Sequence, residues 1–264
     1  MAEAPAVLAQ VNSSDGTRIA YRRSGEGPPL VLVHGTTSAH WSFRYLVPTL
    51  VDRFTVYAID RRGRGDSGDR VEYAIEHEFE DVAAVVDSID EPATLFGHSY
   101  GATVALGAAL SARNLHKLVL YEPAPGISAV PSEDLDRIED LVGRDDREEA
   151  LVQAFRSFGL ARDEVEQLRA SPTWSARVAA AHTVTREIRA EEAYAFDADR
   201  FRDLRAPVLF LLGDESPHWA HEGTERIRAV LPNARVAVLH GEGHMAIMTA
   251  PELVADTVAR FLSE

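Results

Sequence analysis

Six apolar runs rich in Val, Leu and Ile recur along the chain. They cover residues 29–33, 54–59, 93–96, 118–120, 208–212 and 236–239. Each run is apolar throughout rather than alternating, which is typical of strands buried on both faces of a parallel sheet. Helical patterns lie between these runs, at residues 79–89, 102–112, 222–231 and 251–262. The alternation of strand and helix predicts an α/β fold with a mostly parallel, doubly wound sheet.

The start of the chain has a different pattern. Residues 7–11 and 18–22 flank Ser14-Asp15-Gly16, which is a turn signal. We therefore expect an antiparallel N-terminal hairpin at one edge of the sheet.

The strand signal disappears between residues 127 and 203. Charged helical stretches replace it, notably residues 133–142, 147–158 and 163–168. We predict that residues 1–126 and 204–264 form an α/β core domain and that residues 127–203 form a helical cap, or lid. The insertion leaves and rejoins the sheet at the edge where open α/β sheets bind ligands.

The composition is that of a globular protein, with 45% hydrophobic and 26% charged residues in a chain of 264. That length accommodates one α/β domain with an insertion. The formal net charge of −15 argues against a nucleic-acid partner, because phosphate binding requires an extended basic surface. The chain has no cysteine, which excludes disulfides, a thiolate nucleophile and a Cys-based metal site.

The sequence lacks the signals of a membrane or exported protein. No apolar run is long enough to cross a bilayer, and residues 1–15 lack the positive start and apolar middle of a secretion signal. We therefore expect a cytoplasmic protein without a membrane partner that acts on a small-molecule substrate. A homodimer stays open.

The segment from Gly97 to Gly101 carries the strongest chemical signal. It has the pattern G-x-S-x-G with Ser99 at its centre, directly after a predicted strand and before a predicted helix. In this context the pattern predicts a nucleophile elbow, a sharp turn that exposes the serine hydroxyl at the amino end of a helix. The alternative is an ordinary Gly-rich turn in which Ser99 caps the helix.

Together with the elbow, three further segments resemble the α/β-hydrolase superfamily. They are His34-Gly35-Thr36, the stretch from Asp60 to Ser67 with the pattern D-x-R-G-x-G-x-S, and Gly241-Glu242-Gly243-His244. The resemblance covers nearly all of the chain outside the insertion and implies a capped, esterase-like serine hydrolase.

The same resemblance implies an oxyanion hole made by the backbone N–H groups of Thr36 and Tyr100. His34 and the stretch from Asp60 to Ser67 are expected to support these loops rather than to react.

A serine nucleophile needs a base, and the sequence has ten histidines. We expect His244 to be that base, because it follows the last predicted strand in a Gly-flanked loop on the same sheet edge as Ser99. His98 is expected to pack, and His218 lies where it could line the pocket.

The third member of the triad departs from the commonest pattern of the superfamily. The usual position of the acid, after the strand at 208–212, holds Ser216. Glu122, which follows the strand at 118–120, is our preferred candidate because some superfamily members carry their acid at that strand end. Asp214 is second and Glu215 third.

These residues predict a serine hydrolase of the carboxylesterase type that cleaves a carboxylic ester or lactone through an acyl-enzyme on Ser99. No metal or organic cofactor is required. The alternatives are a carbon–carbon bond hydrolase, a cofactor-free perhydrolase or a small-molecule receptor of the same fold. A dehalogenase or epoxide hydrolase is disfavoured, because either would need Asp in place of Ser99.

Substrate choice is expected to depend on the cap and the loops at the sheet edge. Six aromatic residues could line an apolar pocket or simply form core between cap and body: Trp41, Phe155, Phe158, Trp174, Tyr194 and Trp219.

Overall fold

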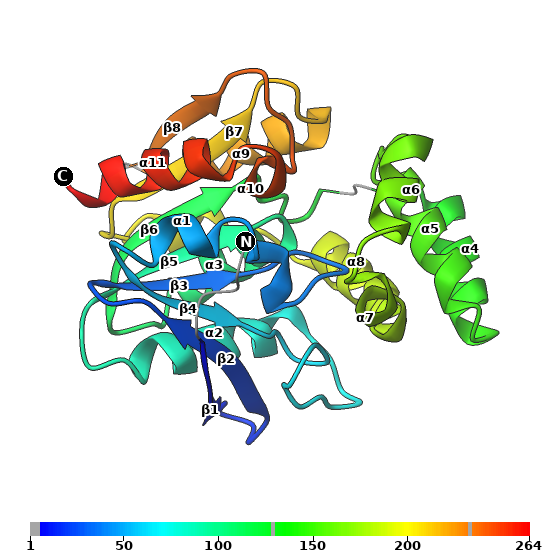
Figure 1. Cartoon of the computed structure of the whole chain (residues 1–264), viewed down its shortest axis with the longest axis horizontal. Helices are drawn as coiled ribbons and strands as arrows, with labels where there is room; N and C mark the ends of the chain where they lie inside the picture. Colours follow the sequence, from blue (N-terminus) through cyan, green and yellow to red (C-terminus); the bar gives the residue numbers. More distant parts are fainter. Residues whose placement is uncertain (1–5, 128–129, 232–233) are drawn as a thin grey trace.

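The structure, a computed structural model, describes residues 6–127, 130–231 and 234–264. Residues 1–5 and 232–233 of the predicted core and residues 128–129 of the predicted insertion lie outside the described residues. The described part of the chain is built around an eight-stranded sheet (Figure 1). Its strands are β1 (Val7–Asn12), β2 (Arg18–Ser24), β3 (Pro29–Val33), β4 (Thr55–Ile59), β5 (Ala93–His98), β6 (Leu115–Tyr121), β7 (Val208–Gly213) and β8 (Ala234–Leu239).

The strand order is β1-β2-β4-β3-β5-β6-β7-β8. The pairs β1–β2 and β2–β4 are antiparallel, and every other neighbouring pair is parallel. The mostly parallel sheet and its antiparallel N-terminal hairpin are therefore confirmed. Because β3, β5, β6 and β7 run in the same direction, the loops that follow them meet at one edge of the sheet.

The sheet differs from the sequence-based prediction at β6 and β8. Strand β6 begins three residues before the predicted start at 118. The polar residues His116 and Lys117 interrupt the apolar run there, so the sequence pattern did not reveal the start of the strand. Lys117 is buried, and its ammonium donates to the carbonyls of Phe261 and Leu262. Strand β8 is half-exposed rather than buried on both faces, since it is the outermost strand and has a neighbour on one side only.

Helices cover both faces of the sheet. One face packs against α2 (Ile75–Asp87), α3 (Tyr100–Ala108) and α9 (His218–Arg228). The other face packs against the short helix η1 (His40–Phe43) and against α1 (Val47–Leu50), α10 (Ala246–Thr249) and α11 (Pro251–Leu262). The helices predicted at 79–89, 102–112 and 222–231 each start and end a few residues earlier in the structure.

A group of helices is inserted between β6 and β7. They are α4 (Ser132–Gly143), α5 (Arg147–Ser157), α6 (Arg162–Arg169), α7 (Trp174–Ala179) and α8 (Val184–Ala193). Two apolar clusters hold these inserted helices together, one around Leu135 and Ile138 and the other around Leu151 and Phe155. Figure 1 shows them gathered on one side of the sheet, with α8 and α7 nearest to it.

Candidate active site

Ser99 sits at a sharp turn between β5 and α3. Its backbone has φ 58° and ψ −130°, a combination that non-glycine residues rarely adopt and that costs free energy. Glycine is required on both sides of the turn. A Cβ at Gly97 would lie 2.3 Å from the Gly101 carbonyl oxygen, and one at Gly101 would lie 2.3 Å from the Val33 carbonyl oxygen. The G-x-S-x-G pattern therefore fits a tight crossing of backbones that holds Ser99 in its strained conformation.

The two backbone N–H groups expected to form the oxyanion hole, those of Thr36 and Tyr100, make no hydrogen bond to any other described residue. Tyr100 is the first residue of α3, where helical N–H groups lack intrahelical partners. The Thr36 loop lies close, because a Cβ on Gly35 would approach the Ser99 Cβ to 2.9 Å. Neither N–H is thus engaged by another described residue, which is compatible with the expected role of the two groups.

His34 braces the loop that carries Thr36. Its Nδ1 donates to the Gly35 carbonyl at 2.9 Å, and its Nε2 accepts from the Arg61 backbone N–H at 3.1 Å. Complete burial and the nearby Arg61 hold the pKa of His34 well below its usual range. The imidazole is therefore neutral and serves as a fixed spacer, in line with its expected supporting role.

The stretch from Asp60 to Ser67 carries a buried charge network. Arg61 donates to both oxygens of Glu78, each at 2.9 Å, and to Glu187 of α8 at 3.0 Å. Arg64 donates to the same Glu187 oxygen at 2.7 Å. We call these four residues, Arg61, Arg64, Glu78 and Glu187, the core–insertion network, because Glu187 belongs to the inserted helices and the others to the core. It ties the insertion down beside the site.

His244 and Glu122 form a buried pair at the same sheet edge. The Nδ1 of His244 lies 2.5 Å from Oε2 of Glu122, whose side chain is fully buried while that of the histidine is 19% exposed. The other Glu122 oxygen accepts from the Gly213 N–H at 2.8 Å and the Ser216 hydroxyl at 2.5 Å. The carboxylate is therefore held by three donors from the ends of neighbouring strands.

These contacts separate the three acids that the sequence left open. Ser216, which occupies the acid's usual position, donates to Glu122 instead. Asp214 accepts from His240 and from the Gly241 N–H at the molecular surface. Glu215 lines the pocket. Of the three acids, Glu122 is the one that contacts His244.

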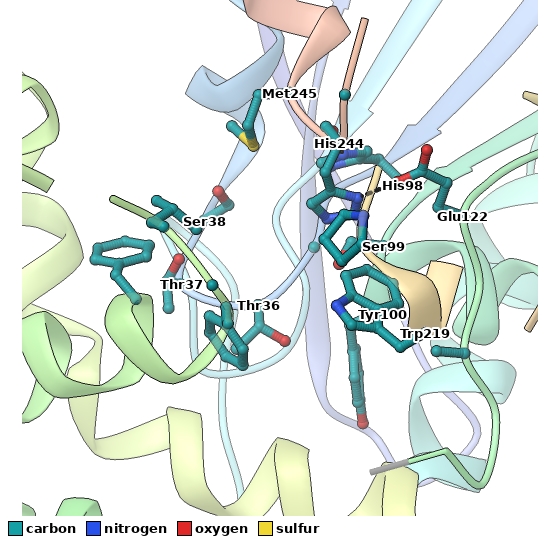
Figure 2. A pocket seen from close by; sticks show the side chains of 18 of the residues that line it. Thr36, Thr37, Ser38, His98, Ser99, Tyr100, Glu122, Trp219, His244 and Met245 are labelled. Atoms are coloured by element: carbon teal, nitrogen blue, oxygen red, sulfur yellow. Dashed lines mark hydrogen bonds and ion pairs between the residues drawn. The ribbon is translucent and has the colours of Figure 1, made fainter. Parts of the chain in front are cut away.

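Ser99 and His244 line the same pocket (Figure 2). Among the described residues no hydrogen bond joins the Ser99 hydroxyl to the His244 ring. Hydrogen bonds of this kind are often long in the absence of substrate and tighten when it binds. Because Nδ1 of His244 faces Glu122, Nε2 is the ring nitrogen left for the hydroxyl.

The backbone of the His244 loop is fixed by side chains that the sequence analysis did not single out for this role. The Nε2 of His98 donates to the His244 carbonyl at 2.8 Å, and its ring stacks on the His244 ring at 4.7 Å. Burial and the adjacent His244 lower the pKa of His98 to about 3, so it stays neutral. Tyr121 donates to the Gly243 carbonyl, and Trp219 meets the His244 ring edge-on at 4.9 Å. His98 is packed as expected, and it also positions the loop.

The pocket has a volume of about 640 Å³, enough for a small organic molecule. Three of the six candidate aromatic residues line it, namely Phe155, Phe158 and Trp219. Tyr194 instead packs on Phe79, Trp174 packs on Phe155, and Trp41 lies under the guanidinium of Arg177. His218 is 92% exposed and lies outside the pocket lining.

Sequence reasoning missed four ionisable residues of the insertion that line this pocket: Glu164, Arg177, Glu191 and Glu192. Each lies in a helix with no motif around it, so the sequence carried no signal for any of them. Among the described residues, no group of three or more His, Asp or Glu side chains is arranged to hold a metal ion. No helix in the described ranges is both long and apolar enough to span a bilayer.

Comparison with known proteins adds the family. The sequence profile described as "Alpha/beta hydrolase family" matches residues 30–257. The chain belongs to the alpha/beta hydrolase family. This match extends from β3 to α11 and includes the elbow, the Glu122–His244 pair and the inserted helices. The resemblance seen in the sequence motifs is thereby confirmed.

Two curated relatives of this alpha/beta hydrolase match along most of their length. The 2-(acetamidomethylene)succinate hydrolase of Mesorhizobium japonicum is 27% identical over 259 residues, covering 91% of this chain and 90% of the relative. The N-formylmaleamate deformylase of Pseudomonas putida is 28% identical over 250 residues, covering 88% of each.

Solved structures resemble this alpha/beta hydrolase over nearly the whole chain. An alpha/beta hydrolase from Sphaerobacter thermophilus has a TM-score of 0.83 at 35% identity, covering 96% of this chain and all of that one (100%). An esterase from Exiguobacterium antarcticum has a TM-score of 0.78 at 20% identity, covering 97% and 99%. The second likeness shows the shared fold alone.

Proposed function

We propose that this protein is a serine hydrolase that cleaves a carboxylic ester or lactone through an acyl-enzyme on Ser99. The observation that carries the proposal is the buried Glu122–His244 pair beside a strained Ser99. A serine hydroxyl needs a base that can accept its proton, and an imidazole oriented by a carboxylate is such a base.

Acylation begins when Nε2 of His244 takes the Ser99 hydroxyl proton as Oγ attacks the carbonyl carbon. The backbone N–H groups of Thr36 and Tyr100 donate to the resulting oxyanion. Glu122 holds Nδ1–H and stabilises the positive charge on the ring. The imidazolium then gives its proton to the leaving alcohol, the ester C–O bond breaks, and the acyl group stays on Ser99.

Deacylation repeats these steps with water as the nucleophile. His244 removes a proton from water, whose oxygen attacks the acyl carbon, and returns the proton to Ser99 Oγ as the acid leaves. Each step uses groups of this chain and water only, so we propose that no metal or organic cofactor takes part. The inserted helices would act as the cap that sets the shape of the pocket.

A second candidate is hydrolysis of a carbon–nitrogen bond. The names of two relatives, the 2-(acetamidomethylene)succinate hydrolase and the N-formylmaleamate deformylase, favour this reaction. The same residues would serve, except that His244 would protonate an amine rather than an alcohol. Carbon–carbon bond hydrolysis, perhydrolysis and a receptor without turnover remain the other candidates.

Pre-steady-state hydrolysis of p-nitrophenyl butyrate by the purified protein tests the proposal. We expect a burst of about one equivalent of p-nitrophenol followed by steady turnover, unchanged by a chelator. Parallel reactions with an anilide and an N-formyl compound measure the second candidate. Ligand-induced thermal stabilisation with neither burst nor turnover would contradict the enzyme and favour the receptor.

A further inference from the structure

Arg177 of α7 is a buried cation in the pocket wall that has no anionic partner. The residue is only 2% exposed, and it lines the same pocket as Ser99. Among the described residues, no carboxylate lies within ion-pair distance of it. A buried charge without a partner is costly, so its retention calls for a physical reason.

The guanidinium is held in one orientation by its surroundings. Nη1 donates to the Thr37 carbonyl at 2.8 Å, to the Thr37 hydroxyl at 3.2 Å and to the Ser38 hydroxyl at 3.3 Å. The carbon at the centre of the group lies 4.5 Å from the centre of the Trp41 ring and 5.8 Å from that of Phe155. These contacts engage one nitrogen and place two aromatic rings near the guanidinium, so they restrict the side chain before any ligand arrives.

The opposite edge of the guanidinium is unused. Nε is buried without an acceptor, and Nη2 makes no hydrogen bond to a described residue. Nε and Nη2 point their N–H bonds in the same direction, which is the fork that grips a carboxylate with two parallel hydrogen bonds. The vacant donors thus match a planar, bidentate anion.

Among the described residues, the charges that act most strongly on Arg177 are both positive. Burial, together with the positive charges of Arg44 and Arg64, lowers the pKa of Arg177 to about 9. Arg64 is itself paired with Glu187. An anionic ligand would therefore relieve an unbalanced positive charge.

Arg177 lies close to the reacting centre. It binds Thr37, the residue directly after Thr36, and Figure 2 shows Thr36, Thr37 and Ser38 across the pocket from His244. Arg177 and Ser99 line the same pocket, so a substrate held at Ser99 lies in the same cavity as the guanidinium.

We propose that Arg177 binds a carboxylate of the substrate, so that this enzyme prefers esters or amides that carry a carboxylate near the scissile bond. The inference rests on the proposed serine hydrolase function and names its substrate class. It also explains why an arginine without a carboxylate partner is tolerated in the pocket wall.

Two matched substrate pairs test the proposal, each replacing a carboxylate by a methyl group. Monomethyl succinate against methyl butyrate places the carboxylate on the acyl side, and acetoxyacetate against ethyl acetate places it on the leaving side. Hydrolysis is followed by base uptake in the wild type, in Arg177→Met and Arg177→Lys, and in Arg169→Met, a control at an exposed arginine of α6.

We expect the wild type to favour the charged member of at least one pair by 10-fold or more in kcat/KM. That preference should fall at least 10-fold in Arg177→Met, partly recover in Arg177→Lys and persist in Arg169→Met. An equal loss on both members of each pair would overturn the proposal, because Arg177 would then only support the Thr37 loop.

Protection of Ser99 from a fluorophosphonate gives a second measurement that needs no variant. Succinate should slow labelling of the wild type more than succinamide does. Equal effects of the two, with no charge preference in turnover, would also overturn the proposal. Failure of Ser99 to label at all would instead contradict the proposed function, so the two failures are distinguishable.

Discussion

The molecule contains two groups of buried charges that are built differently. In the core–insertion network, the carboxylates of Glu78 and Glu187 face the permanently charged Arg61 and Arg64. At the sheet edge, the carboxylate of Glu122 faces the titratable imidazole of His244. A pair of permanent charges can only hold the structure in place, whereas a carboxylate–imidazole pair can take up and release a proton. Under the proposed function, the partner of each carboxylate therefore decides whether the carboxylate contributes to stability or to catalysis.

Removing the nucleophile should have the largest effect on activity and none on the fold. In Ser99→Ala we expect ester turnover to fall by about 10⁴-fold or more, since the acyl-enzyme cannot form. Initial rates and the thermal unfolding midpoint measure the two effects. Because Ser99 makes no contact in the core–insertion network, the midpoint should not fall. Substantial remaining turnover would remove Ser99 from the mechanism.

Replacing Glu122, the acid of the Glu122–His244 pair, should have the second-largest effect on activity. Glu122→Gln cannot stabilise the imidazolium, and we expect kcat to fall by about 10³–10⁴-fold. Asp214→Asn is the matched control, because Asp214 pairs with His240 at the surface. In this variant we expect kcat to change by less than about 3-fold relative to wild type. The reverse ranking would assign the acid to Asp214.

Breaking the core–insertion network should lower the stability of the fold. Glu187→Gln leaves Arg61 and Arg64 without their shared anion, and we expect a loss of about 3–5 kcal/mol in the free energy of unfolding. Denaturant titration measures it. The control is Glu139→Gln. Glu139 lies in α4 and is an exposed partner of Arg189, so its replacement should leave the denaturant midpoint unchanged. Equal midpoints for the two variants would mean that the network does not stabilise the fold.

Glu191 and Glu187 show how the partner of a carboxylate affects its charge. Glu191 lies one helical turn after Glu187 but has a hydroxyl partner instead of arginines. Burial raises the pKa of Glu191 to about 8, with Thr103 donating to it at 2.6 Å. Although burial also opposes ionisation of Glu187, Arg61 and Arg64 lower the pKa of Glu187. Two carboxylates on one helix thus differ in charge because of their partners.

This difference gives a pH dependence of stability. Between about pH 4.5 and pH 8, native Glu191 keeps a proton that the unfolded chain has released, so its contribution to stability is lost as the pH rises. Glu191→Gln is neutral throughout, and we expect a flatter profile of unfolding midpoint against pH, with the gain over wild type largest near pH 8. Parallel wild-type and variant profiles would show that Glu191 is ionised in the fold.

Much of the fold followed from the sequence because its signals are local. The strand β3 and the helix α11 have the predicted bounds, since each is a continuous apolar or amphipathic segment with a proline at its start. The Ser99 elbow could be predicted for a similar reason, because Gly97 and Gly101 have steric requirements that show in the sequence itself.

The features that the sequence did not predict depend on contacts between distant segments of the chain. The start of β6 was hidden by Lys117, whose charge is accommodated by carbonyls of α11. Ser216 gave no indication that it would donate to a glutamate 94 residues earlier. Arg177 and Glu191 reach the pocket only because the inserted helices fold over it, and one sequence contains no local pattern for such a meeting.

The rate at which a fluorophosphonate labels Ser99 tests the central claim most directly, because it measures activation of that hydroxyl without any assumption about the substrate. Intact-mass and peptide analysis over time, in wild type and His244→Gln, gives the rate and the modified residue. We expect one label per chain, on Ser99, formed about 10²–10⁴-fold more slowly in the variant. Equal rates in the two proteins, or a label on another residue, would contradict a Ser99 hydroxyl activated by His244.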